Sequence, residues 1–156
     1  MVESSSIISS FKFISYKVDN FKFEMAKHVS LLGFSGNTKS DDWEINLSIN
    51  QPTYLKKNNL YIGSINCKIV LLSDNNPVVN LETSISGLFQ SDCQLDKTVE
   101  ENLVKYQIPT ILFPYLRSTV TNFIANSGFG SFIFPLINVV ELSKKTLKDI
   151  EINVVE

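Results

Sequence analysis

The stretch Gly33-Phe-Ser-Gly36-Asn-Thr-Lys39-Ser40 contains the residue types of a phosphate-binding loop. Such a loop needs four residues between its two glycines and a lysine directly after the second, so that backbone N–H groups curl around the phosphates. Here two residues separate the glycines, and Lys39 comes three positions after Gly36. The spacing is wrong for nucleotide binding, and we interpret the stretch as a polar turn.

Residues suited to acid–base or metal chemistry are few. His28 is the single histidine, so it could act alone as a base, but no two-histidine metal site can be assembled. Cys67 and Cys93 are 26 residues apart, which does not fit a zinc ribbon, and we expect two free thiols. Adjacent carboxylates at 41–42 and 100–101 fit a solvated loop and a helix start. We therefore expect no catalytic residues, no metal and no cofactor, and a protein that is not an enzyme.

Length and charge exclude further classes of protein. The chain has 156 residues and a formal net charge of -2, without a long run of Lys or Arg, which argues against a nucleic-acid partner. This length is most simply one domain over residues 1–156. The first ten residues lack the basic start of a secretory signal, and no apolar stretch approaches 18 residues. We expect a soluble, cytoplasmic protein that does not insert into membranes.

Alternating apolar and polar residues predict strands over about residues 11–89. From 11 to 26 the alternation changes phase twice, near Phe13 and at Asp19, as it would in a strand with bulges. Residues 43–49 alternate almost perfectly, and two further alternating stretches follow, separated by short polar turns. Together they predict a four-stranded antiparallel sheet with one polar face.

Helical patterns occupy about residues 98–150. Thr98 and Glu101 match a capping box, so a helix should begin near Val99. The next stretch repeats apolar residues at helical spacing despite Pro114 and should end at Gly128. A weaker helix should run over about 138–150. Strands followed by helices predict an α+β domain with helices packed on one face of the sheet.

Aromatic residues are concentrated between positions 113 and 134. There are six of them: Phe113, Tyr115, Phe123, Phe129, Phe132 and Phe134. They could fill the core or a subunit interface, or some of them could line an apolar groove for an extended peptide.

The run Pro109-Thr-Ile-Leu-Phe-Pro-Tyr-Leu-Arg117 resembles the P-x-I-L-F-P-Y-x-R signature of the SecB family of protein-export chaperones. The stretches FKFISYKVDNFKFEM, WEINLSIN and ETSISGLF are similar to strands of that family. The resemblance implies a four-stranded sheet with helices on one side, assembled as a dimer of dimers. It also places the motif helix at the oligomer interface, with the positions Phe113, Pro114, Tyr115, Arg117 and Val120.

Members of the SecB family hold unfolded polypeptides in apolar grooves without nucleotide. The resemblance implies that client-binding groove positions are Ile45, Leu47, Ile49, Leu136, Val139 and Leu142, to which we add Phe34 and Trp43 from their place in the sequence. The three strand residues would alternate in the same way if they only covered the sheet.

The resemblance further implies an acidic sheet face that docks on SecA, the ATPase motor of protein translocation. Asp19, Glu24 and Glu82 match its positions, although three solvated strand carboxylates would look the same. The chain is less acidic than is usual in the family and ends in LKDIEINVVE, without the apolar-then-basic tail of well-studied export members.

Two classes of function remain open. The first is an ATP-independent holdase, as a homotetramer, for unfolded polypeptides: either preproteins for export or the antitoxin of a toxin–antitoxin module. The second is a scaffold with the SecB fold that binds one specific folded partner.

Overall fold

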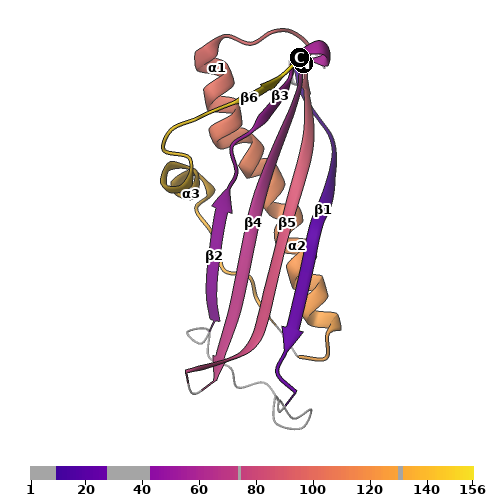
Figure 1. The fold of residues 1–156 in the computed structure, drawn as a ribbon, viewed down its shortest axis with the longest axis vertical. Helices are drawn as coiled ribbons and strands as arrows, with labels where there is room; N and C mark the ends of the chain where they lie inside the picture. Colours follow the sequence, from indigo (N-terminus) through magenta and orange to yellow (C-terminus); the bar gives the residue numbers. More distant parts are fainter. Residues whose placement is uncertain (1–9, 28–42, 74, 130–131) are drawn as a thin grey trace, which may run out of the picture.

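Three long strands dominate the fold in the computed structural model, which describes residues 10–27, 43–73, 75–129 and 132–156 (Figure 1). β5 (Asn76–Ser91) is flanked by β1 (Phe11–Met25) and β4 (Leu60–Ser73), both antiparallel to it. Alternate residues of β4 and β5 are buried, as the alternating pattern predicts: Ile65, Cys67, Ile69, Leu71, Val79, Leu81, Thr83, Ile85 and Phe89.

β1 is irregular at two points, which are the points where the sequence pattern changes phase. Its register with β5 shifts within 13–15 and again within 18–20. Because one extra residue reverses the side of every later side chain, the two bulges keep aromatic residues on the helix side. For example, the Tyr16 ring lies 4.4 Å from the ring of Tyr115. Both predicted irregularities are confirmed.

The opposite edge of the sheet consists of shorter strands. β2 (Trp43–Ile49) and β3 (Thr53–Leu55) both pair with β4, and β6 (Asn153–Val155) lies parallel to β3. The sheet is mostly antiparallel, as expected, but has six strands within the described residues, so the expected number of four was wrong. A strand of three residues is too short to show a period in the sequence, which explains why β3 and β6 were missed.

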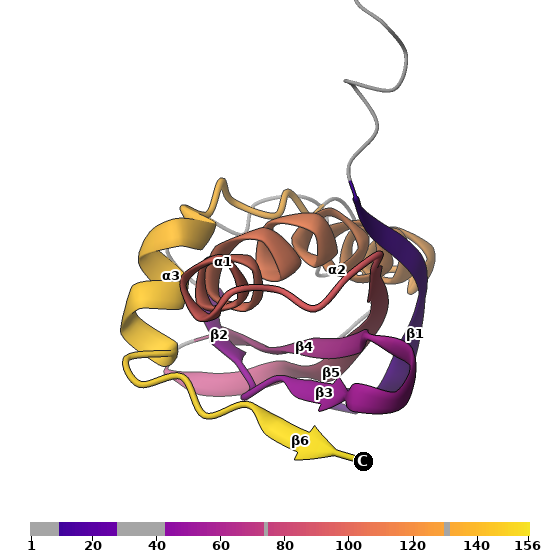
Figure 2. The same ribbon diagram turned by 90° about the horizontal axis from the view of Figure 1, so that it is seen from above.

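A long helical stretch covers one face of the sheet (Figure 2). α1 (Lys97–Asn102) continues through a π-helical turn, η4 (Leu103–Gln107), into α2 (Ile108–Asn126). Pro114 lies inside α2, and Gly128 follows it with a φ of +83°, as is common just after a helix end. The expected α+β architecture is confirmed.

The predicted capping box does not form. α1 begins at Lys97, with Asp96 as N-cap and no capping hydrogen bond from a side chain. Instead, the neighbouring Glu100 carboxylate accepts a hydrogen bond of 2.6 Å from the hydroxyl of Tyr61 on β4. α1 therefore begins without the local motif, and a tertiary contact holds its Glu100.

α3 (Val139–Thr146) lies beside β2 and is shorter than predicted. The Asn138 side chain caps it by accepting a hydrogen bond from the backbone N–H of Glu141 at 3.1 Å. The helix stops before Leu147, which is 1% exposed. The chain leaves the helix at this buried leucine and leads on to β6, so the predicted end at 150 was wrong.

Candidate functional site

β2 carries an apolar stripe on the helix side of the sheet. Trp43, Ile45 and Leu47 are half-buried, and Ile49 is buried. Leu47 lies opposite Cys67 of β4, where burial raises the pKa of the thiol to about 12. The thiol therefore stays neutral at physiological pH and behaves as a small apolar side chain. The predicted alternation of β2 is confirmed, and its apolar residues share one face.

Aromatic residues beyond α2 cover one end of this stripe. The Trp43 ring lies 5.6 Å from the ring of Phe129 and 4.8 Å from that of Phe132. Phe134 packs edge-on against Phe113 at 5.7 Å. All four phenylalanines are buried, so this part of the aromatic cluster fills the core.

The chain between Phe132 and α3 leaves other apolar residues in solvent. Ile133 and Leu136 are 85% and 89% exposed, and Val140 at the start of α3 is also exposed. Val139 and Leu142 are half-buried against the core. Since α3 contacts β2, we define the β2–α3 edge as the following residues: Trp43, Ile45, Leu47, Ile133, Leu136, Val139, Val140 and Leu142.

Of the predicted groove residues, Phe34 lies outside the described part of the chain. Ile133 and Val140 were missed by sequence reasoning. For Ile133 the sequence did contain a signal: it lies between two phenylalanines, Phe132 and Phe134. In an extended chain, neighbouring side chains face opposite sides. Buried phenylalanines at 132 and 134 would have placed Ile133 in solvent.

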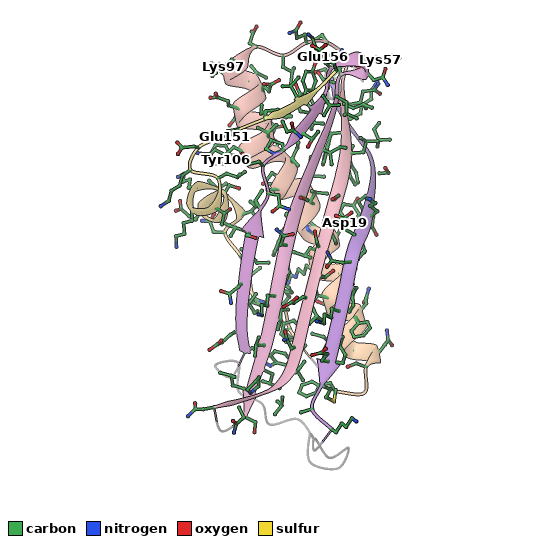
Figure 3. All side chains as sticks on the ribbon, viewed as in Figure 1. Asp19, Lys57, Lys97, Tyr106, Glu151 and Glu156 are labelled. Atoms are coloured by element: carbon green, nitrogen blue, oxygen red, sulfur yellow. The ribbon has the colours of Figure 1, made fainter. Side chains whose placement is uncertain are left out.

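The predicted acidic positions lie on strands, but each has a lysine close by. Asp19, halfway along β1 (Figure 3), pairs with Lys17 at 3.2 Å and accepts a hydrogen bond from the Ser86 hydroxyl. Two similar pairs follow on the same sheet: Lys22–Glu24 at 4.0 Å and Lys68–Glu82 at 3.5 Å. Around these three carboxylates, positive charge offsets negative charge.

The predicted interface positions of α2 divide into two groups. Phe113 and Val120 are 7% and 0% exposed within the chain and have almost no surface left for a partner. Pro114 is exposed, while Tyr115 and Arg117 are half-buried. Only this second group can contribute much area to an interface.

Comparison with known proteins identifies the family. The model of the preprotein translocase subunit SecB matches residues 11–149. The chain belongs to the SecB family. This confirms the resemblance seen in the motif at 109–117, and membership indicates a chaperone-type role.

A solved structure of a SecB-like chaperone has a similar fold. The SecB-like chaperone Rv1957 of Mycobacterium tuberculosis, in complex with a ChAD peptide from the Rv1956 HigA1 antitoxin, has a TM-score of 0.63 at 8% identity, over 82% of this chain and 88% of that one. A Streptococcus agalactiae protein of unknown function has a TM-score of 0.44 at 5% identity, over 81% and 97%. No curated protein matches this SecB-family chain by sequence.

The described residues of this SecB-family chain contain no group of three or more His, Cys, Asp or Glu side chains arranged to hold a metal ion. Among their helices, none has both the length and the apolar character needed to cross a membrane.

Proposed function

We propose that this SecB-family protein is an ATP-independent holdase that binds unfolded polypeptides along the β2–α3 edge. The observation that supports the proposal best is the exposure of Ile133 and Leu136, which lie in the chain segment between Phe132, packed on Trp43 of β2, and α3, which contacts β2. Covering such surface yields about 25 cal/mol per Å². Unfolded clients expose the matching apolar side chains, so binding can proceed without nucleotide.

An antitoxin is the client class that we favour over a preprotein. The SecB-like chaperone of similar fold was solved with an antitoxin peptide. In addition, the carboxylates proposed to dock on SecA each have a lysine within 4.0 Å, which weakens the attraction expected of a purely acidic face. Export of preproteins remains the alternative use of the same edge.

We further propose a cytoplasmic homotetramer in which Pro114, Tyr115 and Arg117 contribute to the interface. Several copies of a weak apolar site, joined by symmetry, would bind one long client with avidity.

The test is binding of reduced, carboxymethylated α-lactalbumin, which stays unfolded, measured by calorimetry on protein of known mass from multi-angle light scattering. We expect Leu47→Asp and Leu142→Asp each to weaken binding at least tenfold, because a carboxylate in an apolar contact must be desolvated. Asn46→Asp adds the same charge to the exposed side of β2 and should bind like the wild type.

Separate outcomes distinguish the competing functions. If the folded wild-type protein does not bind the unfolded probe, the holdase proposal fails. Tight binding to one native protein, with no effect on the aggregation of others, would select the scaffold. Protection of a candidate antitoxin but not of a preprotein in light scattering would support the first client class.

A further inference from the structure

The last residues of the chain form a strand at the rim of the sheet. β6 runs parallel to β3, with Thr53 opposite Asn153 and Leu55 opposite Val155. In Figure 2, the yellow β6 lies next to β3 at the edge of the sheet. Glu151 and Glu156 mark the two ends of this segment (Figure 3).

The contacts that hold this segment are mostly contacts to its main chain. The Gln51 side-chain amide donates to the carbonyl of Asp149 at 2.7 Å and accepts from the N–H of Glu151 at 2.9 Å. The N–H of Asn153 donates to the carbonyl of Pro52 at 2.9 Å. All three hydrogen bonds involve main-chain groups of the segment, so they do not depend on which side chains residues 149, 151 and 153 carry.

The segment itself is held weakly. Val154 and Val155 are 55% and 43% exposed, and only Ile150 and Ile152 pack partly against the core. The ion pair of Lys56 with Glu156 is exposed, and exposed ion pairs contribute little to stability. β6 pairs with β3 over only three residues and buries little surface, so we expect it to detach from β3 readily.

From this arrangement we infer that the edge of β3, with Gln51, is a strand-addition site for an extended segment of an unfolded polypeptide, and that β6 is its built-in occupant. An incoming segment replaces β6 and takes over its main-chain hydrogen bonds. β2 ends two residues before Gln51, so a client on the β2–α3 edge can continue directly onto β3.

Because β6 is covalently attached to the rest of the chain, it competes with a client segment for the edge of β3. A strand attached to the same chain has a high effective concentration, often millimolar. A client can bind only while β6 is undocked, so its apparent affinity is reduced in proportion to the time that β6 is docked. The identity of the incoming segment rests on the proposed holdase function, whereas the existence of the site does not.

Two proline variants separate docking of β6 from other effects. Asn153→Pro removes the donor to Pro52 and should release β6. Val154→Pro is the matched control, because alternate residues of a strand direct their N–H groups to opposite sides and that of Val154 points away from β3. With carboxymethylated α-lactalbumin as the probe, we expect three- to tenfold tighter binding for Asn153→Pro and no change for Val154→Pro.

A disulfide provides the opposite perturbation. Thr53→Cys with Asn153→Cys, in a Cys93→Ser background, joins two positions in register at the spacing of neighbouring strands. The oxidised protein should bind the probe several-fold more weakly, and reduction should restore binding. A disulfide formed between chains would instead make the tail of a second copy the occupant and overturn the assignment to a client.

A synthetic peptide of residues 148–156 tests the site without the holdase. It should bind full-length Asn153→Pro and protect the backbone N–H groups of β3 from hydrogen exchange. If this peptide binds and the unfolded probe does not, the site stands and the holdase fails. If hydrogen exchange shows β6 released in Asn153→Pro but the wild type and the variant bind the probe equally, the strand-addition proposal is wrong.

Discussion

Gly63 on β4 lies directly opposite Gly87 on β5. The positions that their Cβ atoms would occupy are taken by side chains of α2: those of Ile108 at Gly63 and Leu112 at Gly87. This pair of glycines therefore lets α2 lie directly on the sheet, and it sets how closely the helix approaches β4 and β5.

Gly63→Ala should destabilise the fold by about 1–3 kcal/mol, because an added methyl group overpacks the contact with Ile108. Urea unfolding measures the loss. The double variant with Ile108→Ala removes the obstructing atoms, so the two effects should be less than additive. Strict additivity would show that the close approach of helix and strand is not the cause.

Tyr61 should make stability depend on alkaline pH. Burial, and then the hydrogen bond and charge of Glu100, raise the pKa of Tyr61 well above its ordinary value of about 10. The stability that this shift contributes is fully present below pH 10 and is lost as the pH rises toward the folded pKa. Above pH 10 we expect the free energy of unfolding to fall by up to about 1.4 kcal/mol per pH unit.

Tyr61→Phe tests this dependence. At pH 7 it should destabilise by about 1–2 kcal/mol, because Glu100 loses its donor, and the alkaline decline should become shallower. Urea unfolding between pH 7 and 11 measures both effects. Tyr16→Phe, at an exposed position, serves as the control at pH 7. Equal slopes above pH 10 for the wild type and Tyr61→Phe would exclude Tyr61 as the group responsible.

The lysines beside the proposed SecA-docking carboxylates should oppose docking. Replacing Lys17, Lys22 and Lys68 by alanine changes the net charge from -2 to -5. Because the lysine of each pair is more than half exposed, each pair should contribute no more than about 1 kcal/mol to stability. Calorimetry with purified SecA should show tighter, more salt-dependent binding for the triple variant. If SecA binds both proteins equally, it does not use this face.

Pro114 should matter more for assembly than for the subunit. It lies exposed inside α2, where proline lacks the N–H needed for a helix hydrogen bond. Pro114→Ala should raise subunit stability by about 1–3 kcal/mol in urea unfolding, while multi-angle light scattering should show a weakened assembly. An unchanged assembly mass would remove Pro114 from the proposed interface.

The sequence by itself determined the features that repeat locally. The alternation in Trp43–Ile49 predicted which side chains of β2 share a face, and the phase changes near Phe13 and Asp19 predicted both bulges of β1. The motif at 109–117 was specific enough to indicate the SecB family. Each of these signals is contained in a short window, because a strand or helix repeats its side-chain direction every two or 3.6 residues.

Only the tertiary structure decided which residues make contact when they are far apart in the sequence. Glu100 accepts a hydrogen bond from Tyr61, which is 39 positions away, and Gln51 binds the main chain of residues 98 and 100 positions away. No local sequence pattern encodes these contacts, because they depend on how the helices pack on the sheet and on where the segment after α3 runs. The exposed β2–α3 edge and the occupied edge of β3 are consequences of that packing.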